Sequence, residues 1–364
     1  MKHLLFYKPN EVIREEHMNR PGIKNFSHFF KIYNPAITVI DRSNTISTPI
    51  HTTSLFPLPA VRPLTSTFEE LCNARAQELL KQADTLGVTL YTFWSGGIDS
   101  TLLLISLLKN ATPAQRDNIV VLLSEDSIQE YELFFREHID GVLRVDSSNM
   151  FPYLLGSEHI LVNGEHNDQL FGSDIVAKFI ARFGEAFPHQ HYNPDNFFTL
   201  FNETLGDEDA ARFYVRLFEK LKGGAPVPIV SNYDFLWWIN FSLKWQTVSF
   251  RQLPFTAERN IEKISREYIT SRFVRFYNTD DFQIWSMTNP DKKIKDSWKT
   301  YKWVCKDIIY DYTKDADYRD NKIKKGSLHS LLLQQKSYKF IDDSFSFYQK
   351  LDFEEYYNPD SDFV

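Results

Sequence analysis

A run of serine, glycine and aspartate, Ser95-Gly-Gly-Ile-Asp-Ser-Thr101, stands between a strand-like and a helix-like segment. Residues 88–94 are β-branched and aromatic enough for a buried strand, and residues 102–108 form an apolar helical segment. The two glycines allow a sharp turn, and the first N–H groups of the helix lack partners within it. The run therefore predicts an anion site built by Ser95, Gly96, Gly97, Ser100 and Thr101.

No lysine follows the glycines, so this is not the Gly-x-x-x-x-Gly-Lys-Ser/Thr loop of γ-phosphate transferases. The run resembles instead the PP-loop of the ATP pyrophosphatases, which bind ATP and release pyrophosphate. A metal ion would then supply positive charge, and Asp99 is placed to hold it. The alternative is a strand-to-helix turn without a chemical role.

Other polar segments follow further predicted strands, at residues 119–124, 141–145 and 159–162, with a helix expected at 127–138. Strands alternating with helices predict an α/β fold, a Rossmann-like parallel sheet with right-handed crossovers. Ligands bind at the carboxyl ends of such strands. Residues 95–101, 124–126 and 164–168 should therefore meet at one edge of the sheet.

From about residue 175 the chain is expected to be mostly helical, for example at residues 210–221. The aromatic run 233–245 is expected to form a buried helix rather than a base-stacking platform. Residues 241–330 contain 18 Lys+Arg against 12 Asp+Glu. This excess is either a solvated basic face or a lid that neutralises ATP phosphates. A helix expected from Ser297 would place Lys299, Lys302 and Lys306 on one face.

The expected organisation is a small region at 1–65, a domain at 66–330 (nucleotide core 66–175, helical part 176–330) and a tail at 331–364. Strands are expected at residues 4–7 and 36–40, and three prolines at 57, 59 and 63 indicate a linker. A capping box from Ser66 to Glu69 should start a helix that Gly87 ends. The tail is expected to be a partly ordered terminus or an interaction segment.

Composition excludes several classes of protein. A net charge of −7 argues against a general nucleic-acid binder. Two cysteines give no disulfide framework, which favours a reducing cytoplasm. The opening residues are too short and too soon charged to be expected as a signal peptide, and there is no apolar run of about 18 residues, so no membrane association is expected.

Three segments together resemble the synthetase domain of the asparagine synthetase family, which also includes β-lactam synthetases and lasso-peptide cyclases. Ser95–Ser100 resembles its Ser-Gly-Gly-Leu-Asp-Ser, and Gly164-Glu-His-Asn-Asp168-Gln-Leu-Phe-Gly172 resembles its Gly-Glu-Gly-x-Asp-Glu-x-Phe-Gly-Gly. Residues 276–306 resemble its Pro-Phe-Leu-Asp segment and its later Lys-x-x-x-Arg helix. The resemblance spans roughly residues 66–310.

The resemblance implies a site for ATP and Mg²⁺. Asp99 and Asp168 would hold Mg²⁺ on the phosphates, and Ser95, Gly97, Ser100 and Thr101 would surround the pyrophosphate. Adenine would lie near Leu123 and Ser124. Glu165 would act near the incoming amine, and Lys302 would stabilise charge in the transition state.

The implied activity is that of an ATP-dependent ligase that adenylates a small-molecule or peptide carboxylate and transfers it to ammonia or an amine. His166, Gln169 and Ser173 depart from the family pattern, so the acid stays unassigned. Lysine at position 2, where the family's glutaminase half has its nucleophilic cysteine, implies that this chain does not hydrolyse glutamine. The nitrogen would come from free ammonia, a separate partner or an amine on the substrate.

Two other functions stay open. One is a different PP-loop enzyme that adenylates a nucleobase or tRNA, although the acidic composition and the absence of paired cysteines weigh against tRNA thiolation. The other is a degenerate ATP-binding scaffold without catalysis, which the changes at His166 and Gln169 favour.

Overall fold

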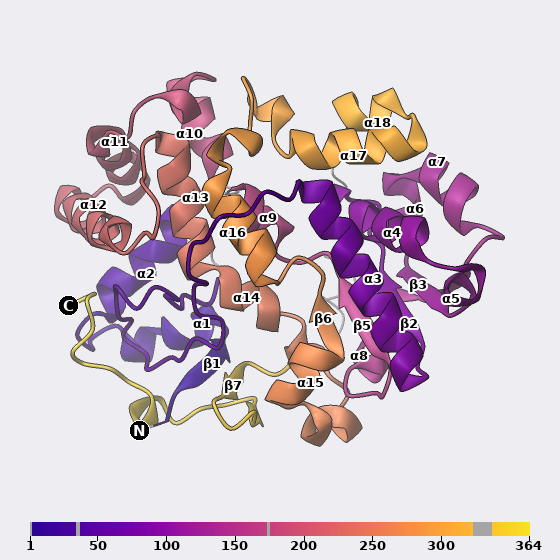
Figure 1. Ribbon diagram of the computed structural model, residues 1–364. Helices are drawn as coiled ribbons and strands as arrows, with labels where there is room; N and C mark the ends of the chain where they lie inside the picture. Colours follow the sequence, from indigo (N-terminus) through magenta and orange to yellow (C-terminus); the bar gives the residue numbers. More distant parts are fainter. Residues whose placement is uncertain (1, 34–36, 173–174, 323–336) are drawn as a thin grey trace.

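The computed structural model describes residues 2–33, 37–172, 175–322 and 337–364 and is built on a five-stranded parallel sheet. The strands are β2 (Leu90–Phe93), β3 (Ile119–Leu123), β4 (Arg144–Ser147), β5 (Ile160–Asn163) and β6 (Phe273–Arg275). Their order is β4-β3-β2-β5-β6, and every neighbouring pair is parallel (Figure 1). The predicted α/β fold is confirmed.

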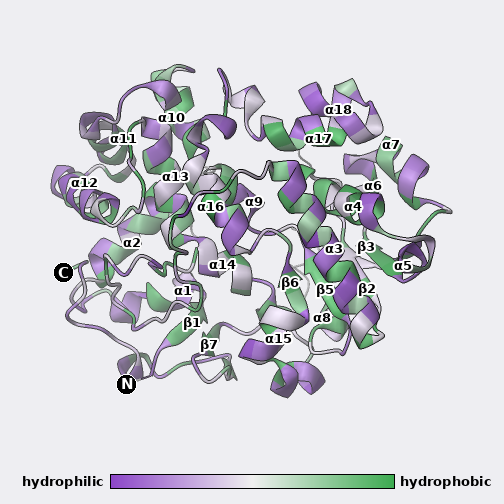
Figure 2. Cartoon of the chain, viewed as in Figure 1, coloured by the Kyte–Doolittle hydropathy of each residue, from purple (hydrophilic) through white to green (hydrophobic). Residues whose placement is uncertain are grey.

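The strand order reverses between β2 and β5. The chain runs outward from β2 through β3 to β4, then returns to β5 on the other side of β2. Such a switch point leaves a crevice at the carboxyl ends of the two central strands, because their following connections leave on opposite sides. In Figure 2 hydrophobic residues run along β2, β5 and β6 of this sheet.

Two predicted elements in this part of the chain, one strand and one helix, need correction. The third strand begins at Arg144, not at Gly141, because Gly141 adopts a left-handed turn (φ 66°) and Leu143 N–H still bonds to Ile139 O at 3.0 Å. The expected helix at 127–138 divides into α6 (Glu125–Glu130), α7 (Glu132–Phe134) and a π-helical turn (Phe135–Ile139). The break falls at Tyr131, which has φ −150° and ψ 70°.

The helices that flank β2 are α3 (Phe68–Leu86) and α4 (Ile98–Asn110), which pack against each other. The capping box of α3 is Thr67 with Glu70, one residue later than predicted, because the Thr67 side chain accepts the Glu70 N–H and Glu70 accepts that of Thr67. Gly87 ends α3 with φ 62°, as predicted.

The predicted helical remainder is also confirmed. The aromatic segment 233–245 falls mainly in α13 (Asn232–Leu243), every residue of which except Asp234 is buried, and continues into α14 (Trp245–Phe250). The other helices are α1 (Pro9–Val12), α2 (Ile23–Ile32), α5 (Pro113–Asp117), α8 (Phe151–Leu154), α9 (Asn167–Phe171), α10 (Val176–Phe183), α11 (Pro194–Leu205), α12 (Glu208–Gly223), α15 (Arg266–Ser271), α16 (Asp280–Thr288), α17 (Trp303–Thr313) and α18 (Ala316–Asn321).

The two terminal regions of the chain share one antiparallel sheet. The predicted strand near the N-terminus is β1 (Leu4–Tyr7), which pairs with β7 (Phe340–Asp342), and β7 pairs with β8 (Phe347–Tyr348). The described part of the tail is therefore packed on the first region. The other strand expected there is absent at residues 37–40, which are buried without regular structure, and residue 36 lies outside the described residues.

The domain boundaries proposed from the sequence remain predictions. Within the described ranges, no helix combines the length and apolarity needed to cross a membrane.

Candidate functional site

The serine–glycine run forms the turn from β2 to α4 at the switch point. Gly96 has φ 74°, and a Cβ there would lie 2.6 Å from Ser127 O and 2.8 Å from the Glu130 side chain. Ser95 N–H donates to Ser100 Oγ at 3.0 Å, which closes the turn. The first regular helix bond joins Thr101 N–H to Gly97 O at 2.9 Å, so the preceding N–H groups stand at the open end of α4.

Thr101 supports this turn from the inside. Its side chain is fully buried, and its hydroxyl accepts a hydrogen bond from Trp94 Nε1 at 3.1 Å. Among the residues predicted to surround pyrophosphate, Ser95, Gly97 and Ser100 line the turn itself, whereas Thr101 packs beneath it.

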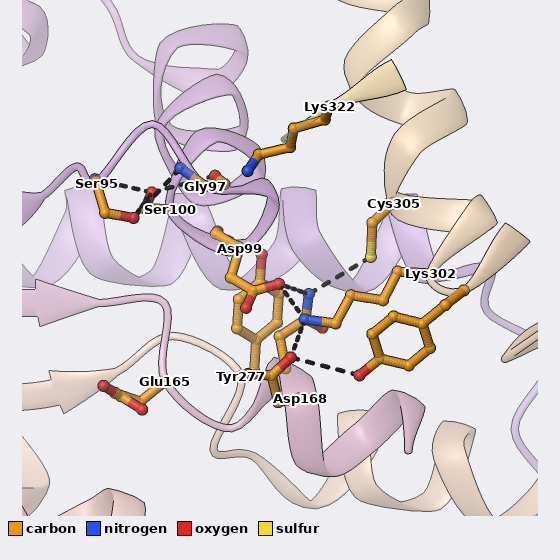
Figure 3. A network of polar contacts seen from close by, with 12 residues as sticks. Ser95, Gly97, Asp99, Ser100, Glu165, Asp168, Tyr277, Lys302, Cys305 and Lys322 are labelled. Atoms are coloured by element: carbon orange, nitrogen blue, oxygen red, sulfur yellow. Dashed lines mark hydrogen bonds and ion pairs between the residues drawn. The ribbon is translucent and has the colours of Figure 1, made fainter. Parts of the chain in front are cut away.

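The second central feature is an ammonium ion between two carboxylates. Lys302 Nζ lies 2.6 Å from Asp99 Oδ1 and 2.6 Å from Asp168 Oδ1 (Figure 3). The Lys302 side chain is 3% exposed, while those of Asp99 and Asp168 are 26% and 39% exposed. Asn167 Nδ2 also donates to Asp99 Oδ1 at 2.7 Å. The structure thus brings together three residues that were predicted to act in one site.

Nearby charges and burial have opposing effects on the pKa values in this cluster. Burial acts to lower the pKa of Lys302, but the negative charges of Asp168 and Asp99 outweigh it and raise that pKa above its ordinary value. Burial raises the pKa of Asp99, and the like charge of Asp168 adds to the increase, although Lys302 opposes it. The ammonium is therefore retained at neutral pH and offsets one of the two carboxylate charges.

Lys302 reaches this position through an unusual backbone conformation. It has φ 58° and ψ 30°, immediately before α17, and its N–H bonds to Lys293 O at 3.1 Å. The predicted continuous helix from Ser297 is therefore wrong, because a 3₁₀ turn (Trp298–Thr300) and the left-handed Lys302 precede α17. Lys299, Lys302 and Lys306 do not form one helix face, and Lys306 Nζ donates to Lys299 O instead.

The residue that holds the Lys302 backbone is itself a buried lysine. Lys293 is 1% exposed, and its Nζ lies 3.8 Å from the centre of the Trp237 ring. Burial lowers the pKa of Lys293 to about 7, despite the opposing charge of Asp234. Burying Lys293 therefore has a free-energy cost. The same lysine holds the turn that places the Lys302 ammonium between the carboxylates.

Two residues in and directly after α18 cover the turn and were not predicted from the sequence. Tyr318 OH donates to Gly96 O at 2.8 Å, and its ring stacks on Tyr131 with centroids 3.6 Å apart. Lys322 Nζ bonds to Glu130 Oε1 at 2.6 Å, and these side chains are only 8% and 4% exposed. Figure 3 shows the Lys322 amine directed toward Gly97. The only feature of the sequence that could have indicated them was the excess of Lys and Arg over Asp and Glu in residues 241–330.

The segments that directly follow β2 and β5 pack against each other. A Cβ at Gly164, directly after β5, would lie 2.9 Å from Asp99 C and 3.0 Å from Ser100 N. Tyr277 OH, just after β6, donates to Asp99 O at 3.0 Å. The predicted meeting of residues 95–101 with 164–168 is confirmed.

Glu165 lies apart from the Lys302 cluster in Figure 3. Its carboxylate accepts two hydrogen bonds from Arg251 Nη2, at 2.6 and 2.7 Å, and a weaker one from Gln252 Nε2 at 3.3 Å. The Glu165 side chain is 9% exposed and that of Arg251 is 44% exposed. The arginine was not predicted, because 86 residues separate it from Glu165 and no motif marks it.

The two described departures from the family pattern are buried. His166 keeps a left-handed backbone with φ 78°, the conformation that glycine adopts most readily, so histidine here retains the turn with added strain. Its Nε2 lies 2.8 Å from Ser249 Oγ, and burial, followed by the charge of Arg275, lowers its pKa well below the ordinary value. Gln169 is 1% exposed. Ser173 lies outside the described residues.

Leu123 and Ser124 border an open recess of about 450 Å³ at the carboxyl ends of β3 and β4. Ser124 also caps α6 by accepting the Ser127 N–H at 3.3 Å. The residues lining the recess are Leu123, Ser124, Glu125, Ile128, Val145, Asp146 and Ser147. The recess borders the strand next to β2, where adenine was predicted.

The described residues contain no cluster of three or more His, Cys, Asp and Glu side chains suited to a metal ion. Asp99 and Asp168 supply two carboxylates that face a common cation, Lys302. Mg²⁺ usually takes only one or two carboxylates, together with substrate phosphates and water. The donor set therefore fits Mg²⁺ in combination with a bound phosphate chain.

Comparison of the chain with protein-family models found no match, and comparison with curated proteins found none either. The site combines the uncapped start of α4, two carboxylates, two lysines with buried side chains and a neighbouring recess.

Proposed function

We propose that this chain is an ATP-dependent ligase that resembles the synthetase domain of asparagine synthetases. In this reaction a carboxylate oxygen attacks the α-phosphorus of ATP, the bond to the β-phosphate breaks, and pyrophosphate leaves. Ammonia or an amine then attacks the acyl carbon, loses a proton, and displaces AMP. One observation supports this proposal most: the Lys302 ammonium lies between Asp99 and Asp168, beside the glycine turn at the switch point.

The glycine turn and the two lysines are proposed to bind the triphosphate. The N–H groups at the start of α4 would donate to phosphate oxygens, together with the Ser95 and Ser100 hydroxyls. Lys322 would exchange its bond to Glu130 for one to the pyrophosphate, since its amine already points toward Gly97. The recess at Leu123 and Ser124 would receive adenine.

Asp99 and Asp168 would hold Mg²⁺, which neutralises phosphate charge and makes pyrophosphate a better leaving group. Lys302 would then be free to stabilise negative charge on the reacting groups, because the metal replaces it as the partner of the carboxylates. Glu165 would accept a hydrogen bond from the incoming amine, and Arg251 would hold the Glu165 carboxylate in place until the amine arrives.

We also propose a source for the nitrogen and a compartment for the protein. Ammonia would come from solution or from a separate amine-supplying partner. Cys72 and Cys305 are both free and buried, which suits a cytoplasmic protein.

A second candidate is an ATP-binding scaffold without catalysis. Two observations favour it: Lys302 occupies the space between the proposed metal ligands, and Arg251 already pairs with Glu165. A scaffold would bind ATP but release neither AMP nor pyrophosphate.

The test is acid-dependent exchange of labelled pyrophosphate into ATP, combined with hydroxylamine trapping of activated acids from a pooled library. We expect exchange and hydroxamate formation with one acid class in wild-type protein, and neither in D99N. D117N, which changes an exposed aspartate at the end of α5, is the matched control. ATP binding without exchange across the library would favour the scaffold, and exchange that survives in D99N would contradict the proposed site.

A further inference from the structure

The outer edge of the sheet carries an unusual set of exposed residues. All four residues of β4 are exposed, and within the described residues β4 pairs only with β3. Eight large apolar side chains in the described chain are exposed by 40% or more, and four of them fall within residues 142–153. These are Val142 (59%), Val145 (51%), Met150 (40%) and Tyr153 (51%).

An exposed strand edge offers unpaired backbone N–H and C=O groups to another chain. Proteins usually protect such edges with charged residues, and β4 carries Arg144 and Asp146. These two charges have opposite signs and share one face of the strand, because side chains alternate along it. An edge with this pattern disfavours strand pairs that place like charges opposite each other. A copy of the same strand running in the opposite direction can place unlike charges opposite each other.

We propose that β4 pairs antiparallel with β4 of a second copy of this chain, about a twofold axis at Val145. This register places Arg144 opposite Asp146 of the partner subunit, and the reverse, with the two Val145 residues facing each other. Opposite residues in an antiparallel pair have Cβ atoms roughly 5 Å apart, close enough for both ion pairs. The register is therefore self-complementary in charge.

Four strand residues alone bury too little area for a stable interface. Val142, Met150 and Tyr153 lie close in sequence to the strand, and we assign them to the rim that the second copy covers. The expected product is a reversible dimer whose fraction rises with protein concentration. Because Val145, Asp146 and Ser147 also line the recess beside Ser124, pairing would stabilise one wall of that recess.

The test is sedimentation velocity over a roughly hundredfold concentration range, with nucleotide absent, so that its result does not depend on the proposed ligase activity. Wild-type protein should shift from monomer toward dimer. D146R places arginine opposite arginine at two positions, and we expect the dissociation constant to rise about tenfold or more. The exchanged variant R144D/D146R restores both ion pairs and should recover the wild-type dissociation constant.

R216D, on an exposed position of α12, provides the control for a reversed charge away from the edge. Circular dichroism establishes that each variant is folded. A wild-type protein that stays monomeric throughout the range overturns the proposal. A dimer that persists unchanged in folded D146R, or fails to return in folded R144D/D146R, overturns the assigned edge or register.

Discussion

The ammonium of Lys302 lies 2.6 Å from a carboxylate oxygen of Asp99, although 203 residues separate the two in the chain. This contact joins the first turn of α4, which follows β2, to the residue that precedes α17. The same ammonium reaches Asp168 after β5, so it connects the two central strands at their carboxyl ends. Substitutions around this contact separate its structural role from its chemical role.

K302M should lower both stability and activity. It leaves Asp99 and Asp168 facing each other without a cation, and we expect a loss of about 2–3 kcal/mol in the free energy of unfolding. This loss of stability is smaller than that expected for a fully buried ion pair, because Asp168 is 39% exposed and partly screened by water. Pyrophosphate exchange should fall about a hundredfold or more. Urea unfolding and exchange assays measure the two effects, and K299M, at a neighbouring exposed lysine, should change neither.

D168N should weaken ATP binding mainly when Mg²⁺ is present. The amide is a poorer ligand than the carboxylate, so we expect the dissociation constant of Mg²⁺–ATP to rise about tenfold. Calorimetric titrations with and without Mg²⁺ measure the difference. If D168N and wild-type protein respond equally to Mg²⁺, Asp168 is not a metal ligand.

G164A should disturb the site through the backbone. The added Cβ would lie 2.9 Å from Asp99 C, and neither of these main-chain segments can give way without moving the glycine turn. We expect about 1–3 kcal/mol of destabilisation and weaker ATP binding. G223A is the matched control, since a Cβ at Gly223 meets nothing within 4 Å. Thermal unfolding and ATP titration of the two variants should differ clearly, and equal behaviour would refute the tight contact.

Lys293 should make stability depend on pH. Its pKa is about 7 in the folded protein, against an ordinary value of 10.5. Between these values the unfolded chain binds the proton and the folded chain does not, so the free energy of unfolding rises with pH. From about pH 7 to about pH 10 the gain should be on the order of a few kcal/mol. K293M should remove this gain, as measured by urea unfolding at several pH values, whereas K292M, at the neighbouring half-exposed lysine, should retain it.

The sequence alone determined the local parts of the molecule. Apolar runs, glycines and helix signals predicted the β2–α4 turn at residues 95–101, the strand at residues 159–162 (observed as Ile160–Asn163), and the buried helix α13. These features depend on neighbours in the chain, because side-chain periodicity and backbone freedom act over a few residues. A parallel sheet then brings strand ends together whatever their spacing in sequence.

Tertiary structure decided the features that depend on distant partners. Lys302 adopts a left-handed backbone because Lys293 and the two carboxylates hold it, which a helix-periodicity argument cannot foresee. Lys322 reaches the glycine turn only because α18 folds over it, and β1 finds β7 at the other end of the chain. Such contacts arise from long-range packing and charge pairing, and these override local propensity wherever their combined free energy is larger.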